Sequence, residues 1–453
     1  MELLADDAPA PRRVPPVPEP PDEELPTLRF VRAMRSNGIL CWTKRAYEVP
    51  TLRRRVLGRT RLTVSDPEGI RRVLVENADN YVRTAITVRM LRPVLGDGLL
   101  ISEGATWRHQ RRTLAPAFTP RAVEGLVPLI VSAVDEAIAA LETATDGPVD
   151  LFGALQHMAL EIAGRTMFSV GLHRHGAELR AFVGEYAERL GRPHLFDALV
   201  PLRFATPLDR ARMRFRRRWI AFLDRVIAER GAPRGHDLLD LMRAARDPES
   251  GEGFSQEALR DQVATLILAG HETTALTLLW ACTLLALAPE IQERVADEVR
   301  AAGPDAPWQA LTLTRAVVDE TLRLYPPAFV VARVAVGPDA IAGEAVSAGD
   351  VIAISPWLLH RHRRLWRDPD AFDPGRFLPG APPIPRFAYL PFGAGPRVCI
   401  GAQFALAEAV LALSRLVGRF RIARADARPV LPAAIVTTQP DHAPLFRLTL
   451  REA

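Results

Sequence analysis

The sequence contains few of the residues that would cross-link a small secreted protein. Its 453 residues include three cysteines, Cys41, Cys282 and Cys399, and one lysine, Lys44. An odd number of widely spaced cysteines excludes a disulfide framework and indicates a reducing compartment, so we expect a cytoplasmic protein. Because all but one of the 58 basic residues are arginine, we interpret the usage as that of a GC-rich, bacterial coding sequence.

The sequence also lacks a secretory signal, a strong charge of one sign and a long hydrophobic run. Its net charge of +5, from 58 basic and 53 acidic residues, is not that of a dedicated nucleic-acid binder. The longest apolar stretch, residues 274–289, is shorter than a bilayer requires, and His271 and Glu272 lie just before it. We therefore expect a soluble monomer with no transmembrane segment and no nucleic-acid partner.

Apolar residues at helical spacing dominate the sequence. Residues 9–26 carry eight prolines, so we predict a flexible leader over residues 1–30 and one domain over residues 31–453. The longest unbroken helix is predicted from Ser255 to Ala288; it would be about 50 Å long, apolar on most of its circumference and buried. Further elements are predicted at residues 55–66 (strand), 209–231 (helix) and 401–420 (helix). The fold class is therefore mainly α with a smaller β-rich part.

The segment "FGAGPRVCIG", residues 392–401, holds a lone thiol in a loop that precedes the last predicted helix. Backbone N–H groups and the helix dipole there favour a thiolate at Cys399, and a thiolate can ligate iron. The glycines of the loop permit unusual dihedral angles and close approach to a flat cofactor, and Arg397 could neutralise a carboxylate of that cofactor. The alternative is a buried structural cysteine in a turn.

The loop resembles the haem-binding signature of the cytochrome P450 family, F-x-x-G-x-R-x-C-x-G. The matching residues are Phe392, Gly395, Arg397, Cys399 and Gly401, and Ala405 and Glu408 follow at the family's usual offsets. The resemblance implies the cytochrome P450 fold, with the long central helix over a buried haem b. It also implies that Cys399 is the axial iron ligand and that the backbone at Gly393 and Gly401 approaches the porphyrin.

Two further motifs follow the family's order. "ETLR" supplies Glu320 and Arg323, and "FDPGRF" supplies Arg376, which together resemble the family's structural Glu-Arg-Arg network. Alone, the first pair is equally typical of a solvated helix. Gly375 stands where the family usually has glutamate, which leaves the role of the arginine intact.

Four residues resemble the family's contacts with the haem propionates. "WRHQR" is similar to a W-x-x-x-R helix, so Trp107 and Arg111 would each donate a hydrogen bond to a propionate. Arg333 matches another propionate-binding position, and Arg397 of the cysteine loop would join them. A surface arginine is the alternative for Arg333 taken alone.

The segment "AGHETT", Ala269 to Thr274, places a glycine, an acid and two hydroxyls in the middle of the long apolar helix, where their burial is costly. One alternative is a kinked helix whose threonine hydroxyls bond back to carbonyls. The resemblance instead implies an oxygen-binding groove, with Ala269 and Gly270 beside the haem. Thr273 would hydrogen-bond dioxygen through water, and Glu272 would relay protons. Family members that use peroxide directly tend to lose this acid–alcohol pair.

The resemblance implies a monooxygenase that hydroxylates or epoxidises an apolar substrate with O2. No reductase is fused, so electrons would come from a ferredoxin or flavodoxin and its NAD(P)H-dependent reductase. Arg108, Arg112 and residues 361–367 could form a basic face for such a partner, although a solvated charged face is an equal alternative. Residues 212–219, "RMRFRRRW", are interpreted as a solvated cluster, with membrane-surface contact as a minor alternative.

Substrate-facing positions are also implied by the resemblance. They are Leu266, Ala269, Ala328, Phe329, Val330 and Val331, with segments of residues 82–101, 165–205 and 436–440. Most are apolar, which predicts a hydrophobic substrate and leaves fatty acids, terpenoids, polyketides and aromatic compounds open. The motifs look more like those of fatty-acid and terpenoid hydroxylases and of the microsomal branch than like bacterial members with histidine at position 397. A peroxygenase or isomerase of the same fold, and a non-catalytic haem sensor, are the alternative functions; the Glu272–Thr273 pair argues against them.

Overall fold

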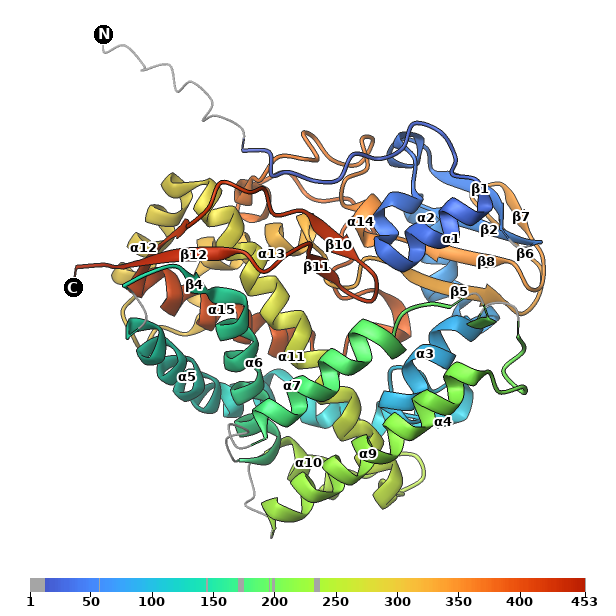
Figure 1. The fold of residues 1–453 in the computed structure, drawn as a ribbon, viewed down its shortest axis with the longest axis horizontal. Coiled ribbons are helices and arrows are strands. Elements are labelled where there is room, and N and C mark those ends of the chain that lie inside the picture. The colour runs from blue at the N-terminus through green and yellow to red at the C-terminus, as the bar shows by residue number, and fades with distance from the viewer. Residues whose placement is uncertain are drawn as a thin grey trace.

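The computed structural model describes residues 13–452, except residues 57, 144–145, 170–174, 195, 198–199 and 232–236 and the side chains of residues 187 and 188. Helices account for 56% of the protein and strands for 12%, which confirms the predicted mainly α class. Figure 1 shows the long helix α11 crossing the middle of the molecule, with the largest sheet on one side and most of the helices on the other.

The helices that carry the core are spread over the whole sequence. The α-helices are α1 (Thr27–Ser36), α2 (Pro67–Arg71), α3 (Ala85–Leu95), α4 (Gly104–Leu114), α5 (Pro120–Glu142), α6 (Leu151–Phe168), α7 (Gly176–Glu185), α9 (Pro207–Arg230), α10 (Leu238–Ala244), α11 (Gln256–Leu287), α12 (Pro289–Ala302), α13 (Thr312–Leu324), α14 (Pro356–Leu359) and α15 (Ala402–Arg419). Short helical turns are η1 (Gly38–Cys41), η2 (Lys44–Tyr47), η3 (Arg72–Glu76), η4 (Ala78–Asn80), η5 (Ala115–Phe118), η6 (Tyr186–Leu190), η7 (Trp308–Ala310), η8 (Pro374–Phe377) and η9 (Gly395–Arg397). The predicted helices at residues 209–231 and 401–420 are confirmed as α9 and α15.

The strands form small sheets, largely antiparallel. They are β1 (Thr51–Val56), β2 (Arg59–Val64), β3 (Tyr81–Arg83), β4 (Val149–Asp150), β5 (Val331–Ala335), β6 (Asp339–Ile341), β7 (Glu344–Val346), β8 (Val351–Ile354), β9 (Phe420–Arg424), β10 (Pro432–Ala434), β11 (Thr438–Pro440) and β12 (Leu445–Leu450). The largest sheet has the order β1-β2-β8-β5-β3, in which only the β2–β8 pair is parallel. The strand predicted at residues 55–66 is instead the β1–β2 hairpin, which turns at Gly58 with a φ of 78°.

Helix α11 confirms the predicted long central helix to within one residue at each end. The side chain of Ser255 accepts a hydrogen bond from the Ala258 N–H and caps the start of the helix. Pro289 begins the next helix and ends α11. Among the described residues, α11 alone is long and apolar enough to cross a membrane, yet 67% of its most apolar window is buried inside the protein. That burial is typical of the core helix of a globular protein.

Two apolar clusters meet along α11. Its C-terminal half, from Ala275 onward, packs with α5, α6 and α15, whereas its N-terminal half, up to Ile267, packs with α3, α7, α9 and α10. The "AGHETT" segment lies at the junction of the two clusters. The fold therefore places the polar part of the long helix where neither cluster covers it fully.

The predicted flexible leader needs a correction from Arg13 onward; residues 1–12 lie outside the described residues. The carbonyl of Arg13 accepts a hydrogen bond from the N–H of Phe372 at 2.8 Å, and that of Pro21 accepts one from Lys44 at 3.0 Å. Helix α1 already begins at Thr27. This proline-rich segment is therefore extended, as its composition predicts, but hydrogen bonds attach it to the rest of the protein.

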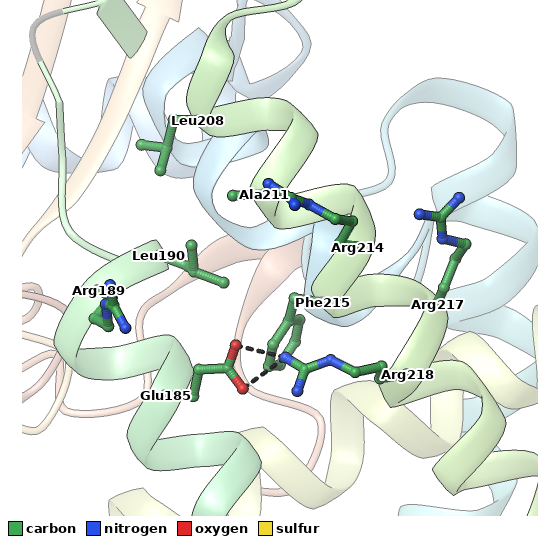
Figure 2. A pocket seen from close by; sticks show the side chains of 9 residues that line it. All are labelled: Glu185, Arg189, Leu190, Leu208, Ala211, Arg214, Phe215, Arg217 and Arg218. Carbon is green, nitrogen blue, oxygen red and sulfur yellow. Dashed lines mark hydrogen bonds and ion pairs between the residues drawn. The ribbon is translucent and has the colours of Figure 1, made fainter.

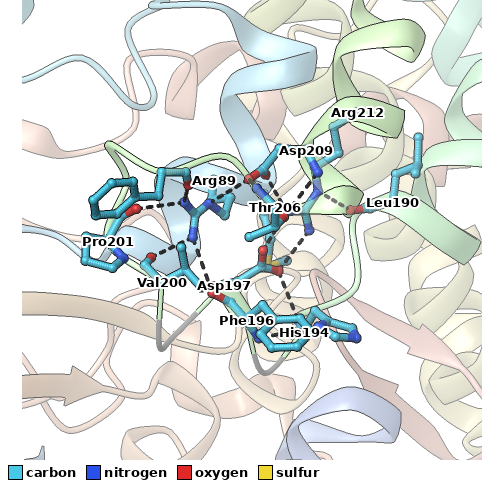
Figure 3. Close-up of polar contacts among 12 residues, drawn as sticks. Arg89, Leu190, His194, Phe196, Asp197, Val200, Pro201, Thr206, Asp209 and Arg212 are labelled. Atoms are coloured by element: carbon cyan, nitrogen blue, oxygen red, sulfur yellow. Dashed lines mark hydrogen bonds and ion pairs between the residues drawn. The ribbon is translucent and has the colours of Figure 1, made fainter.

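The arginine-rich cluster at residues 212–219 is not simply solvated. Arg212 is fully buried and forms a two-pronged ion pair with buried Asp197, at 2.7 and 2.9 Å (Figure 3). Phe215 and Trp219 are also buried, facing the core along one side of α9. The prediction is wrong for these three residues because helical periodicity turns every third or fourth position inward.

Arg89 of α3 holds the loop that leads into α9. Its guanidinium donates hydrogen bonds to four carbonyls of that loop, at 2.7 to 3.3 Å (Figure 3). The carbonyls belong to Phe196, Val200, Pro201 and Phe204. One buried side chain thus joins two segments that the sequence analysis expected to face the substrate.

Candidate active site

The cysteine loop is held by hydrogen bonds of its own backbone. The N–H of Cys399 donates to the carbonyl of Phe392 at 2.9 Å, which closes the loop just before α15. Gly393 and Gly395 both have a φ of 72°, in the left-handed region that favours glycine. The unusual dihedral angles predicted for the loop are therefore present at these two positions. Gly401 has a φ of −89°, so its backbone does not require glycine, contrary to our expectation.

Gly395→Ala is expected to lower the free energy of unfolding by about 3–5 kcal/mol. A Cβ at this position would lie 1.9 Å from the carbonyl oxygen of Leu74, so steric overlap adds to the left-handed backbone strain. Gly393→Ala is the matched control, because it has the same φ but no atom within 4 Å of its added Cβ, and it should cost about 1–2 kcal/mol. Urea unfolding of both variants measures the difference, and equal losses would contradict the steric argument.

Cys399 is the accessible thiol of the three. Cys41 and Cys282 are buried, and desolvation raises their pKa values to about 11 and about 12, so they remain protonated and inert. The side chain of Cys399 is exposed, although enough protein surrounds it that desolvation also raises its pKa. The N–H of Gly401 and the charge of Arg111 lower that pKa, as the loop geometry predicts, but desolvation outweighs them.

Three guanidinium groups gather beside the loop around a single carboxylate. Arg83 and Arg333 are direct partners across the β3–β5 pair, an arrangement that is unfavourable for like charges. Glu103 accepts a hydrogen bond from Arg83 at 2.9 Å and pairs through its other oxygen with Arg397. Burial and the neighbouring arginines lower the pKa values of Arg333 and Arg397 to about 10. The cluster therefore has a surplus of positive charge that an anionic group would balance.

Helix α4 contributes two of the predicted residues to the same place. The guanidinium of Arg397 lies 4.3 Å from the ring centroid of Trp107, a cation–π contact. One turn further on, Arg111 donates to the carbonyl of Val398 at 2.9 Å and so reaches the residue before Cys399. The structure thus brings Trp107, Arg111, Arg333 and Arg397 to one side of the cysteine loop.

One stripe of α11 is accessible although most of the helix is buried. Ala269 is exposed, and Leu266, Gly270 and Thr273 are half-buried. These positions are spaced three and four residues apart, so they share one face of the helix. This accessible stripe contains the α11 positions that were expected to face oxygen and substrate.

The hydroxyl groups of "AGHETT" have different partners. Thr273 donates to the carbonyl of Ala269 at 2.6 Å, which is the back-bonded arrangement of the alternative prediction. Its neighbour Thr274 instead donates at 3.1 Å to Glu408, which is buried in α15. Helices α11 and α15 are therefore joined by a polar contact directly beside the accessible stripe.

Glu408→Gln is expected to make the protein more stable than the parent at pH 8 but not at pH 5. Burial raises the pKa of Glu408 to about 8, whereas a carboxyl group in the unfolded chain has a pKa of about 4.3. As the pH rises from about 4.3 to about 8, only the unfolded state ionises, so the parent loses up to about 5 kcal/mol of stability. Glutamine cannot ionise and avoids that loss. Urea unfolding at both pH values tests this, and a pH-independent difference between the two proteins would contradict it.

The Glu272 carboxylate is hydrogen-bonded to the C-terminal β-hairpin. Its Oε1 accepts hydrogen bonds from the Thr437 hydroxyl at 2.9 Å and from the Gln439 side-chain amide at 2.6 Å. Both donors belong to the segment of residues 436–440, which the sequence analysis expected to face the substrate. The predicted proton-relay acid is therefore bonded to a hairpin from a distant part of the chain.

The structure places Glu320, Arg323 and Arg376 together. Glu320 and Arg323 are fully buried and form a two-pronged ion pair, at 2.6 and 2.7 Å. The Nε atom of Arg376 lies 3.5 Å from the Glu320 carboxylate, and the N–H of Asp373 donates to that carboxylate at 2.8 Å. The network joins α13 to the segment that precedes the cysteine loop.

A second set of hydrogen bonds connects this network to the loop itself. Arg323 donates to the carbonyl of His360, whose Nε2 accepts a hydrogen bond from the N–H of Leu390 at 2.8 Å. Burial and the charge of Arg323 lower the pKa of His360 to about 3, so its ring is neutral and Nε2 is free to accept. The carbonyl of Leu390 then accepts from Gly393 at the start of the cysteine loop.

The sequence profile of the family described as "Cytochrome P450" matches residues 23–443 of this chain. The chain belongs to the cytochrome P450 family. It is 34% identical to cyclooctatin synthase and to cyclooctat-9-en-7-ol 5-monooxygenase, both of Streptomyces melanosporofaciens; these alignments cover 79% and 73% of this chain and 79% and 74% of the relatives. Pentalenene oxygenase of Streptomyces avermitilis is 30% identical over 85% of this chain and 87% of its own.

The fold leads to the same family. A crystal structure of a cytochrome P450DA heme domain superimposes with a TM-score of 0.80 at 27% identity, and the match covers 97% of this chain and 98% of that one. The protein is therefore a cytochrome P450 monooxygenase. The family implies a haem-thiolate cofactor, and the accessible thiol, the surplus of arginines and the accessible stripe on α11 all fit such a group.

The substrate-facing positions expected of this P450 divide into two groups. Ala328 is exposed, and Val330 and Val331 are half-buried, so all three can be reached. Phe329 is buried, and its ring packs edge-on against Trp42 with a centroid separation of 6.3 Å. The prediction for Phe329 is therefore not supported, because its side chain belongs to the core beneath the accessible neighbours.

The predicted basic face is smaller than expected. Arg361 is buried and stacks on Trp357, with its guanidinium 3.6 Å from a ring centroid, so it cannot be part of the surface. Arg112 forms a two-pronged ion pair with buried Asp247 at 2.8 Å, which neutralises its charge. Residues 108, 363, 364 and 367 remain exposed, although three of them have exposed or half-buried acidic partners, at 3.6 Å for Arg108, 2.7 Å for Arg363 and 3.7 Å for Arg367. In the sequence, Arg361 and Arg112 look like free surface charges. The residues that cover Arg361 and neutralise Arg112 cannot be identified from the residues next to them.

Several residues near the site were not singled out from the sequence. They are Arg83, Glu103, Glu408 as a partner of Thr274, and the pair Thr437 and Gln439. Arg83 and the hairpin lay inside predicted substrate segments, but nothing in a single sequence shows which side chain of a segment meets which acid.

An open cavity of about 690 Å³ lies elsewhere on this P450, between η6 and α9. Figure 2 shows its apolar floor and its rim of arginine side chains, one of which, Arg218, is paired with Glu185. It is lined by Glu185, Arg189, Leu190, Leu208, Ala211, Arg214, Phe215, Arg217 and Arg218. None of these residues was predicted to contact haem or oxygen, but Glu185, Arg189 and Leu190 belong to the segment of residues 165–205 that was expected to face the substrate.

Proposed function

We propose that this cytochrome P450 binds haem b through the Cys399 thiolate and inserts one oxygen atom of O2 into an apolar organic substrate by hydroxylation or epoxidation. The observation that carries the proposal is the accessible Cys399 thiol beside an arginine cluster with unbalanced positive charge. When bound, the haem would supply the oxidising chemistry of the family. The protein would supply the ligand, the orientation and the protons.

The arginine cluster would orient the cofactor. Arg83, Arg333 and Arg397 share one carboxylate, Glu103, so two positive charges are left for the two propionates of a haem b. Trp107 and Arg111 are the further donors that the resemblance implies. A bound metal cation also favours the thiolate form of its cysteine ligand, which opposes the desolvation that raises the Cys399 pKa.

The stripe on α11 would deliver protons. Thr273 would exchange its bond to the Ala269 carbonyl for one to a water molecule, since a hydroxyl can rotate to suit its partner. Glu272, the adjacent acid, would take protons from solvent and pass them toward that hydroxyl. The absence of a side chain at Gly270 leaves the helix surface open at this point; a Cβ there would have no atom within 4 Å.

Thr273→Ala is expected to keep the cofactor but to divert about tenfold more of the NAD(P)H electrons into hydrogen peroxide, because one proton donor of the relay is lost. Thr283→Ala is the matched control: it removes the same kind of back-bond, from Thr283 to the Leu279 carbonyl at 2.8 Å, farther along α11. Peroxide released per NAD(P)H oxidised measures the effect. If Thr273→Ala couples electrons to product as well as the parent does, the relay assignment is wrong.

Electrons would reach the protein from a ferredoxin or flavodoxin and its NAD(P)H-dependent reductase. The exposed arginines at positions 108, 363, 364 and 367 are the part of the predicted basic face that could meet an acidic partner. We also propose that the protein is a cytoplasmic monomer, in keeping with its three free cysteines and its relation to soluble bacterial P450 proteins.

The substrate would be largely apolar. Leu266, Ala269, Ala328, Val330 and Val331 are the accessible or half-buried predicted contacts, and all are aliphatic. The printed names of two relatives specify pentalenene and cyclooctat-9-en-7-ol, which favours an unsaturated hydrocarbon skeleton over a polar metabolite.

A reduced, carbon-monoxide-bound absorption spectrum of the purified protein tests the proposal. A Soret band at the position of a thiolate-ligated haem is expected, whereas a band at the position of a histidine-ligated haem would contradict it. Titration with apolar compounds should then shift the spin state, and turnover should require the reductase and NAD(P)H. Full turnover with hydrogen peroxide alone would indicate a peroxygenase, and binding without turnover a sensor.

A further inference from the structure

The Glu272 carboxylate is held by a hairpin that lies 165 and 167 residues further along the chain. The hydroxyl of Thr437 and the side-chain amide of Gln439 both donate to Oε1, at 2.9 and 2.6 Å. The amide of Gln439 also lies 3.4 Å from the Thr437 hydroxyl, so the two donors and the acid form one small network. Within the described part of the chain, the other carboxylate oxygen, Oε2, accepts no protein hydrogen bond.

The hairpin that carries the two donors is fixed on three sides. Thr438, between them, donates through its N–H and hydroxyl to the carbonyls of Pro327 and Pro326. Its own carbonyl accepts from the indole N–H of Trp280, two turns beyond Glu272 on α11. Asn37 of the N-terminal region bonds the opposite strand, at Pro432 and Ala434. The donors are therefore rigidly placed and impose their geometry on the acid.

We infer that Thr437 and Gln439 are positioning residues that set the orientation of Glu272 for proton delivery. Their bonds hold Oε1 and leave Oε2 as the oxygen that can exchange a proton with water. Nothing in this role requires a new bond to carbon or an electron transfer; a proton leaves the Glu272 carboxyl and is replaced from solvent. The inference rests on the proposed function, because it assigns the support for the relay acid named there.

The same hairpin carries positions that are expected to face the substrate. Val436, directly before Thr437, is exposed at the tip, in the segment expected to face the substrate. The anchoring carbonyls of Pro326 and Pro327 directly precede Ala328, another accessible position. A substrate at these positions would therefore lie against the same hairpin that holds Glu272.

Two variants that remove one donor each, Thr437→Val and Gln439→Leu, test the inference in the haem-loaded full chain. We expect each to raise hydrogen peroxide released per NAD(P)H oxidised by about 2- to 5-fold, as the loss of one hydrogen bond would. The double variant should approach the ratio of Glu272→Gln, and Thr437→Ser, which keeps the hydroxyl, should return to the parental ratio. Pentalenene and dodecanoic acid, in separate assays, serve as the apolar probes.

The solvent isotope effect on NAD(P)H oxidation separates positioning from a general loosening of the fold. Mispositioned Glu272 should raise that isotope effect while the carbon-monoxide spectrum and the unfolding temperature stay parental. If the double variant keeps the parental peroxide ratio and isotope effect while Glu272→Gln raises both, the inference is overturned and the proposed function stands. If Glu272→Gln itself changes neither, the relay in the proposed function is wrong, and the inference fails with it.

Discussion

Cys399→Ser is expected to lower NAD(P)H-dependent product formation more than about 100-fold, because changes one shell away from a metal ligand already cost 10–100-fold. The thiol is exposed at the end of a loop that its own N–H closes onto Phe392, so the sulfur is placed to ligate iron. Serine fits the same space, but its hydroxyl is a harder and far less acidic ligand that donates less charge to the metal. Product formation and the carbon-monoxide spectrum measure the loss.

Cys282→Ala is the matched control for the loss of a thiol. Cys282 is fully buried in α11, and desolvation raises its pKa to about 12, so it takes no part in ligation. This variant should lose some stability through the small cavity it leaves, while its spectrum stays parental. A parental spectrum in Cys399→Ser would contradict the assignment of the ligand, whatever the activity.

The features that could be predicted from the sequence are those that depend on residues close together in the sequence. The span of α11 follows from an unbroken apolar pattern between Ser255 and Pro289, and the site loop from a motif of ten residues. The left-handed backbone at Gly393 and Gly395 was expected on the same local grounds. Even so, the main reason why Gly395 tolerates no side chain is the carbonyl of Leu74, which no local pattern could reveal.

What could not be predicted depends on partners that are distant in sequence. Arg212 and Arg361 occur in runs of arginine that look like solvated surface, but Asp197 and the Trp357 ring cover them in the fold. The partner of Glu272 is a similar case, because the pairing of α11 with Gln439 is set by tertiary packing alone. Charge and hydrophobicity in a single sequence do not specify these contacts.

Glu320→Gln is expected to lower the free energy of unfolding by about 3–5 kcal/mol, because it leaves the fully buried charge of Arg323 without its counter-ion. All five N–H donors of Arg323 are used: two bond Glu320, and the others bond the carbonyls of His360, Pro369 and Ala371. Glutamine can accept one of the two lost bonds, but it supplies no negative charge. Urea unfolding of the two proteins measures the difference.

The same substitution should also loosen the cofactor, since the network leads through His360 and Leu390 to the cysteine loop. Asp297→Asn is the matched control: Asp297 and Arg300 form an ion pair of the same i,i+3 spacing at 2.7 Å, but both side chains are about two-thirds exposed. Solvent screens that pair, so its loss should change stability very little. If both substitutions cost the same, the Glu320–Arg323 pair stabilises the fold no more than an exposed pair does. A destabilised Glu320→Gln protein that retains haem as tightly as the parent would show that the network supports the fold but not the loop.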